Sequence, residues 1–132
     1  MKNKLLILIG IFVFVQFGFS LSCFFPYYKI EDGTIMYYGG SNKVMLEKFD
    51  IETFEGLDSA FGKDKNHVYF TGKIIEKIDA KTFEIVSRYE PKPIPNSPWG
   101  IGCQTSYITE FKDKNGTYKL EDFQSGKLKL KE

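Results

Sequence analysis

Residues 63–86 read KDKNHVYFTGKIIEKIDAKTFEIV, and this stretch decides the fold. Aromatic and β-branched residues fill the segments 67–70 and 73–76, and these segments flank Thr71-Gly72. Such residues favour strands, and a two-residue connection that contains glycine is typical of a tight hairpin. The stretch therefore predicts an antiparallel β-hairpin.

Parts of this stretch recur along the chain. The string Asp50-Ile-Glu-Thr-Phe-Glu55 returns 29 residues later as Asp79-Ala-Lys-Thr-Phe-Glu84, and KDKN at 63–66 returns at 112–115. The repeat-motif residues are Asp64, Asn66, Tyr69, Asp113, Asn115, Tyr118, Phe54 and Phe83. Recurrence at a fixed period is the sequence signature of a repeat architecture.

A weaker copy of the unit begins at Asp32, with Tyr37 in the place of Tyr69. Each unit is too small to bury its apolar face alone, so the hairpins should stack on their neighbours. Phe54 and Phe83 are expected to plug each hairpin against the next. The fold class we predict is all-β: tandem antiparallel β-hairpins that form a small twisted sheet or a short solenoid-like stack.

The repeated string resembles the signature of the DKNYY family, in which tandem copies occur in exported bacterial proteins. The match is close at 63–86, and the resemblance covers 32–89 with a partial copy at 112–118. It departs from the family pattern where the first copy lacks Lys-Asn and the last copy stops early. The resemblance implies a repeat and export, and it implies nothing about catalysis.

The first 22 residues have the layout of a secretory signal peptide. Lys2 and Lys4 precede an apolar run at 5–15, and small residues follow at Gly18 and Ser20. An apolar signal helix is therefore expected ahead of the β-structure, and a retained signal anchor is the alternative. Export would place the protein in the periplasm or at the outer cell surface, with membrane association through the N-terminus.

Cys23 carries two competing predictions. The residues before it resemble a permissive lipobox, in which Cys23 would be lipidated and tether the chain. Alternatively Cys23 and Cys103 form a disulfide, which an exported compartment permits. The two predictions exclude each other, and lipidation is slightly favoured.

Beyond the repeats at 23–89, the proline-rich segment 90–98 (EPKPIPNSP) predicts an extended connector. Residues 99–132 then form a C-terminal β-hairpin region with the partial repeat, in which Asn115-Gly116 is the turn between strands at 103–111 and 117–123. The alternating tail at 127–131 is expected to be an edge strand protected by lysines.

Composition argues against several function classes. Eighteen basic and 17 acidic residues give a net charge of +1, so the basic footprint of a nucleic-acid binder is missing. A single histidine, His67, and two cysteines leave little material for a metal cluster or a nucleophilic triad. We predict no catalytic, cofactor-binding or metal-binding residue.

Two groups of side chains invite a functional interpretation. The acidic residues Asp50, Glu52, Glu55 and Asp58 resemble the carboxylates of a glycosidase, although neighbours on one turn usually form a solvated face. Tyr37, Tyr38 and Trp99 are a candidate interaction surface if they are exposed, and core residues if they point inward.

The sequence therefore predicts a non-catalytic, exported or membrane-tethered interaction module, whose partner is a protein or an envelope glycan and not a nucleic acid. The alternative is a cell-envelope carbohydrate-active hydrolase that uses carboxylates, or an inhibitor or immunity-type protein.

Overall fold

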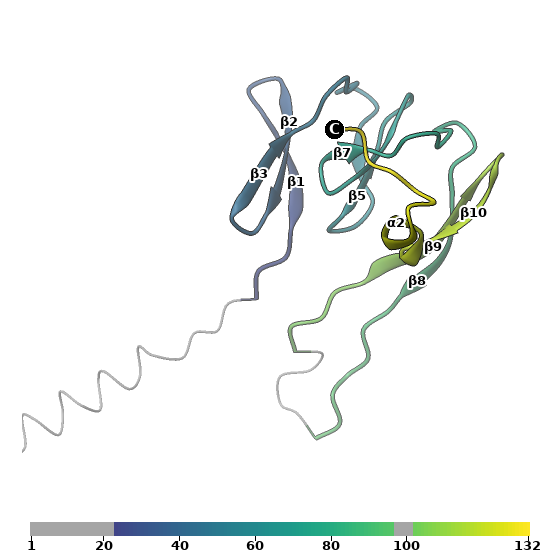
Figure 1. Ribbon diagram of the computed structural model, residues 1–132. Helices are drawn as coiled ribbons and strands as arrows, with labels where there is room; N and C mark the ends of the chain where they lie inside the picture. The colour runs from purple at the N-terminus through teal and green to yellow at the C-terminus, as the bar shows by residue number, and fades with distance from the viewer. Residues whose placement is uncertain (1–22, 97–101) are drawn as a thin grey trace, which may run out of the picture.

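The computed structural model describes residues 23–96 and 102–132, and these residues form three antiparallel sheets (Figure 1). The first sheet contains β1 (Tyr27–Glu31), β2 (Thr34–Gly39) and β3 (Asn42–Met45). The second contains β4 (Glu55–Gly56), β5 (Phe61–Lys63), β6 (Val68–Phe70) and β7 (Lys73–Ile74). The third contains β8 (Glu84–Tyr89), β9 (Tyr107–Asp113) and β10 (Gly116–Lys119), and the short helix α2 (Glu121–Ser125) follows it.

The prediction of an all-β chain built from antiparallel strands is confirmed. The predicted signal helix lies in residues 1–22, outside the described residues. Neighbouring strands along the chain pair in sequence order, so each sheet is a simple meander, and its connections are short except for the one between β8 and β9.

Two of the hairpin turns have left-handed backbone conformation. Thr71 and Gly72 have φ values of 51° and 83°, and Asp32 and Gly33 have φ values of 50° and 75°. Positive φ at both central residues matches the twist of the flanking strands, as in the type I′ turn. Only two residues connect β2 to β3, because Gly39 pairs with Asn42.

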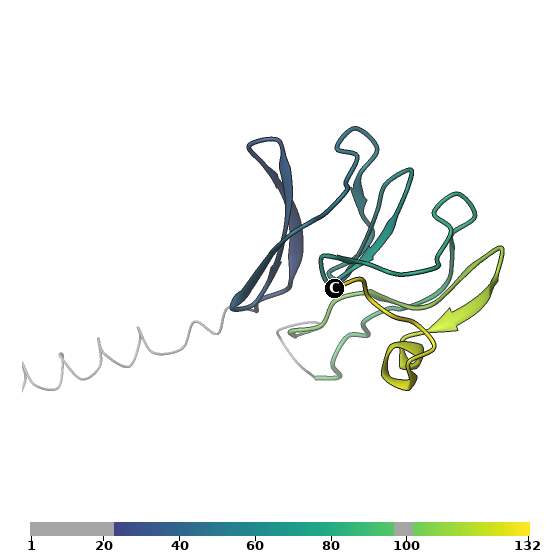
Figure 2. The ribbon, with the colours of Figure 1, turned by 45° about the horizontal axis from the view of Figure 1, so that its top comes forward.

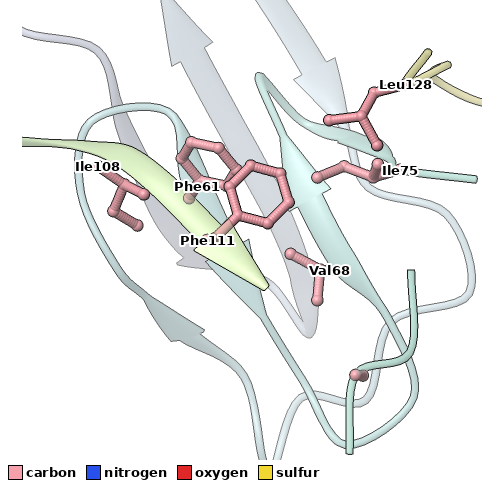
Figure 3. Close-up of a cluster of buried hydrophobic side chains, with 7 residues drawn as sticks. Phe61, Val68, Ile75, Ile108, Phe111 and Leu128 are labelled. Atoms are coloured by element: carbon pink, nitrogen blue, oxygen red, sulfur yellow. The ribbon is translucent and has the colours of Figure 1, made fainter. Parts of the chain in front are cut away.

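The three sheets stack side by side, with the second sheet in the middle (Figure 2). Alternation along β6 sends Tyr69 into the cluster against the first sheet, and Val68 and Phe70 into the cluster against the third. The core between the second and third sheets is drawn in Figure 3, where Phe61 and Phe111 lie against one another with ring centroids 5.3 Å apart.

The third sheet crosses the predicted domain boundary at residue 89. β8 precedes the proline-rich segment and β9 follows it, yet the two strands pair, from Glu84 opposite Lys112 to Tyr89 opposite Tyr107. The proline-rich segment therefore lies inside the third repeat unit, between two paired strands.

The strand expected at 117–123 is correct only in its first half. β10 ends at Lys119, whose N–H donates to Asp122 Oδ2 at 2.8 Å, and α2 follows. Beyond the helix the tail runs antiparallel to β7: Glu76 N–H donates to Lys129 O and Lys131 N–H to Ile74 O, both at 2.8 Å. The tail thus covers the edge of the second sheet and buries Leu128.

The close contact between the first two sheets requires glycine at position 62. A Cβ atom there would lie 2.8 Å from Phe54 Cζ and 3.3 Å from Tyr28 Cε2. We expect Gly62→Ala to lower the free energy of unfolding by about 1–3 kcal/mol, because overpacking forces the rings to move. Denaturant titration measures this change.

Gly56 provides the matched control, because it pairs with Gly62 across the same sheet and a Cβ there would meet only Tyr28 Cδ2 at 3.9 Å. Gly56→Ala should change stability by less than about 0.5 kcal/mol. Equal losses in the two variants would contradict the proposed packing.

Candidate interaction surface

A buried carboxylate holds the turn of the repeat motif. Asp64 is 1% exposed and begins the connection from β5 to β6. Its Oδ1 accepts the backbone N–H groups of Asn66 at 2.8 Å and His67 at 2.7 Å. Its Oδ2 accepts the Asp50 N–H at 2.8 Å and the Tyr69 hydroxyl at 2.9 Å. One side chain therefore joins this turn to the segment that enters the second sheet.

The segment that begins at Asp50 completes the connection. Asp50 Oδ2 accepts the N–H of Thr53 at 3.1 Å and also the Thr53 hydroxyl. The oxygen of that hydroxyl accepts the Lys65 N–H at 3.0 Å. We call this arrangement, formed by Asp50, Thr53, Asp64 and the amides that they bind, the Asp–Thr clamp.

Most of the clamp recurs one unit later with equivalent partners. Asp113 accepts the N–H groups of Asp79 and Asn115, each at 2.8 Å, and Thr82 Oγ1 accepts the Lys114 N–H at 2.9 Å. Asp79 Oδ2 accepts the N–H of Thr82 at 3.1 Å, as Asp50 does for Thr53. The segment between the two aspartates of each clamp contains the first two strands of a sheet, β4 and β5 in the second sheet and β8 and β9 in the third.

The remaining repeat-motif residues lie in the core or in the turn. Phe54 packs between Tyr28 and Tyr69, with ring centroids 5.3 and 6.0 Å away. Phe83 and Tyr118 pack against Phe111 at 5.5 and 5.7 Å. Their ring contacts hold neighbouring strands and sheets together.

The hydrogen bonds of the clamp control the charge of Asp64. Burial by itself would raise the pKa of this carboxyl. The backbone N–H groups of Asp50, Asn66 and His67 and the Tyr69 hydroxyl outweigh burial, so the pKa lies below its usual value. Burial, followed by the hydrogen bond to Asp64, raises the pKa of Tyr69. Asp64 is therefore ionised and structural near neutral pH.

A cavity of about 740 Å³ lies beside β1. Its lining is mainly aromatic and aliphatic, with a few hydroxyl groups, one carboxylate and the amine of one lysine: Phe25, Pro26, Tyr27, Tyr28, Lys29, Ile30, Phe54, Gly56, Leu57, Asp58, Ser59, Thr105 and Ser106. The Tyr28 hydroxyl donates to Ala60 O at 2.6 Å and accepts the Gly72 N–H at 3.2 Å. Burial raises the pKa of Tyr28, so this hydroxyl stays neutral.

Both oxygens of Asp58, the carboxylate in this lining, accept hydrogen bonds from backbone N–H groups. Oδ1 accepts the N–H groups of Ala60 at 2.8 Å and Phe61 at 2.5 Å, and Oδ2 accepts the Ile108 N–H at 2.8 Å. Asp58 thus connects the second sheet to the third. The acidic residues that resembled a glycosidase pair are therefore separated: Asp50 belongs to the clamp, and Glu52 and Glu55 are exposed.

The outer face of the first sheet carries a group of amphipathic side chains. Tyr27 stacks on Tyr38 with ring centroids 5.1 Å apart, and Lys43 Nζ lies 5.0 Å from the centroid of the Tyr38 ring. Glu31 accepts the Tyr38 hydroxyl at 2.6 Å and pairs with Lys29 at 2.9 Å. We call these five residues the tyrosine face.

The tyrosine face includes only one residue of the predicted interaction surface. Tyr38 lies on it, but Tyr37 does not, because adjacent strand residues point to opposite faces and Tyr37 is only 5% exposed in the core. Trp99 lies outside the described residues.

The structure joins Cys23 to Cys103 by a disulfide, with their Cα atoms 5.5 Å apart. This bond occupies the thiol that lipidation would require, so the structure contains the second of the two predicted alternatives. It connects the chain just before β1 to the segment that precedes β9.

The structure shows neither a metal-ligand cluster nor a membrane-spanning helix within 23–96 and 102–132. No group of three or more histidine, cysteine, aspartate or glutamate side chains in these ranges could hold a metal ion. His67, the only imidazole, lies in the β5–β6 connection with a buried Nδ1 that has no hydrogen-bond partner. No helix in the described ranges is long and apolar enough to cross a membrane.

The sequence patterns did not identify the cavity or the bridge made by Asp58. Tyr27–Glu31 shows no hydrophobic alternation, and its pairing with Thr34–Tyr38 gives the cavity one wall. A signal for Asp58 was present, since an aspartate two or three residues before a strand often accepts backbone N–H groups in a turn.

A stack of short antiparallel sheets, fastened twice by the same aspartate–threonine turn, defines a small all-β repeat protein. The chain belongs to the DKNYY family, whose model matches residues 3–122.

Part of the chain is also similar to glutamine synthetases. Those of Bos taurus and Sus scrofa are 27% identical over 88 residues, which is 64% of this chain and 22% of each of those proteins. The enzyme of Canis lupus familiaris is 28% identical over 76 residues, 57% of this chain and 19% of that protein. The chain thus spans about a fifth of the length of these relatives. No solved structure matches it.

The clamp predicts unequal effects of two equivalent substitutions. Asp64→Asn should lower the free energy of unfolding by about 2–4 kcal/mol, because the amide NH₂ cannot accept the N–H groups that remain buried around it. Asp113→Asn should cost about 1 kcal/mol, since Asp113 is only half-buried. Urea denaturation compares them, and equal effects would contradict the assigned role of burial.

The low pKa of Asp64 also predicts a pH dependence. A carboxyl whose pKa is lower in the folded than in the unfolded chain stabilises the fold above about pH 4, and loses this contribution as the pH falls through its folded pKa. The stability difference between the wild type and Asp64→Asn should therefore shrink as the pH falls below about 4. A difference that grows with acidification would reverse the predicted sign.

The disulfide predicts the form of the mature chain. Mass spectrometry of unreduced, digested protein from membrane and soluble fractions should yield a peptide pair joined through Cys23 and Cys103. A diacylglyceryl-modified Cys23 together with a free Cys103 thiol would instead support the lipoprotein prediction.

Proposed function

We propose that this protein is a non-catalytic, exported interaction module that binds a partner protein or an envelope glycan. The tyrosine face carries this proposal. It lies at the end of the stack, where no sheet formed by the described residues covers it, whereas the corresponding side of the second sheet is covered by the first sheet.

The chemistry of the tyrosine face suits recognition. Tyr27 is 45% exposed, and its ring and that of Tyr38 offer a broad apolar surface next to the charges of Lys29, Lys43 and Glu31. Tyrosine contributes a large contact area at a low cost in side-chain entropy and also offers a polar hydroxyl. Stacked rings fit a sugar or the side chains of a protein partner.

The cavity supports recognition more than hydrolysis. Glycoside hydrolysis by carboxylates needs two acidic groups at a defined separation across a cleft. Asp58 is the carboxylate among the described lining residues, and three backbone N–H groups occupy its oxygens. No observation on the described residues therefore favours the hydrolase alternative.

Export is proposed from the secretory layout of the N-terminus. The Cys23–Cys103 disulfide supports it, because disulfides persist in oxidising compartments. We place the protein in the periplasm or at the outer cell surface. A lipid tether at Cys23 would require a form of the protein in which this disulfide is absent.

The test removes the stacked rings from the tyrosine face. Tyr27→Ala combined with Tyr38→Ala should abolish capture of the partner from envelope extracts, and should weaken binding to purified cell-wall glycan if the partner is a glycan. The captured material is identified by mass spectrometry after cross-linking.

A second stacked pair provides the matched control. Tyr89 and Tyr107 lie on the third sheet with ring centroids 5.0 Å apart and are 37% and 40% exposed. Alanine at both of these positions should leave capture unchanged. An identical set of captured partners for the wild type and both double variants would contradict the proposed function.

A further inference from the structure

Each of the three sheets contains an equivalent hairpin. The turn of that hairpin shows which residues of the three sheets correspond to one another. Glu31, Asp64 and Asp113 each precede a two-residue turn, because they pair with Thr34, His67 and Gly116. The positions one residue earlier, Ile30, Lys63 and Lys112, are therefore equivalent. In the structure the residue equivalent to Asp64 is therefore Glu31 and not Asp32, because Asp32 lies inside the turn.

In the second and third sheets a further strand pairs at this position. Glu55 of β4 lies opposite Lys63, and Glu84 of β8 lies opposite Lys112. In the first sheet no strand among the described residues pairs with the outer edge of β1, the edge away from β2. Ile30 is left 52% exposed.

The backbone of β1 presents hydrogen-bonding groups at this edge. Leu46 N–H donates to Ile35 O at 2.9 Å, so the main-chain groups of Ile35 face β3. In an antiparallel ladder, opposite residues either exchange hydrogen bonds or both face away from each other. Ile30, which lies opposite Ile35, therefore directs its N–H and C=O to the outer edge, and so does Tyr28 two residues earlier.

The 740 Å³ cavity lies beside this same edge and indicates what it accepts. Tyr28 and Ile30 line one side, and the segments 56–59 and 105–106 line the others. A strand added at this edge would therefore lie against side chains of these segments. The lining is mostly apolar, and where the other two sheets present a lysine opposite a glutamate, the first sheet presents Ile30.

We infer that the outer edge of β1 binds an extended, apolar segment of a partner protein by β-strand addition, with an uncharged side chain opposite Ile30. The inference rests on the proposed function and deepens it by giving the chemistry of the partner. Main-chain hydrogen bonds would supply affinity, and the cavity would select the side chains.

Two synthetic peptides test this inference. One has the sequence of residues 82–89, TFEIVSRY, which occupies the equivalent edge in the third sheet, and the other carries Glu84→Val. The valine peptide should bind the full chain on the order of tenfold more tightly, because a carboxylate opposite Ile30 would lose its hydration. Isothermal titration calorimetry measures both affinities.

Two proline variants locate the binding edge. Ile30→Pro removes an outward N–H without breaking a hydrogen bond to β2, so it should abolish binding of the valine peptide. Met45→Pro makes the same change on the opposite edge of the sheet, where Met45 pairs with Met36 and is 59% exposed, and binding should persist.

Modified peptides provide the same test if Ile30→Pro does not fold. N-methylation of the valine peptide at the residue opposite Ile30 should abolish binding, and N-methylation one residue later should not, because that amide points away from β1.

Several results would overturn the inference. One is equal affinities of the two peptides, and another is binding that survives Ile30→Pro or the first N-methylation. A third is slow hydrogen exchange of the Ile30 amide without peptide, because it would mean that the protein's own chain covers the edge. A dimer lost in Ile30→Pro would assign the edge to a second copy. Failure of these tests with capture by the tyrosine face intact would refute the strand addition and leave the proposed function standing.

Discussion

The ionised carboxylate of Asp64 is the constraint on which the rest of the structure depends. A buried charge is costly unless hydrogen bonds compensate it, and here three backbone N–H groups and the Tyr69 hydroxyl do so. Because one of these amides belongs to Asp50, the carboxylate fixes how the chain enters the second sheet. The recurrence of the bonds at Asp113 fixes the entry to the third sheet in the same way.

The clamps set the spacing between sheets, and that spacing explains the exposed features. The sheets approach closely enough for Phe54 and Tyr28 to cover Gly62, and Asp58 ties the second sheet to β9. The first sheet lacks both the clamp and a covering strand, so it leaves the tyrosine face and the outer edge of β1 open within the described residues. The features proposed to bind partners thus lie where the repeat is incomplete.

The sequence predicted those features of the fold that depend on residues close together in the chain. The hairpin around Thr71-Gly72, the repeated aspartate–threonine turn and the all-β class follow from residue preferences and recurrence. Pairings across long separations could not be predicted: β8 with β9 across the proline-rich segment, and the tail with β7. The sequence left open whether Tyr37 lies on the surface or in the core, because the face of a strand residue depends on a register that its neighbours alone do not reveal.

The charge state of Asp64 offers the most direct test of this account. A ¹³C NMR titration of its side-chain carboxyl, assigned with the Asp64→Asn variant, reports the pKa in the folded protein. We expect a pKa below the usual aspartate value of about 3.9, because the hydrogen bonds to Asp50, Asn66, His67 and Tyr69 stabilise the ionised form more than burial destabilises it. A pKa at or above that value would contradict the account, since the clamp would then not hold an ionised carboxylate.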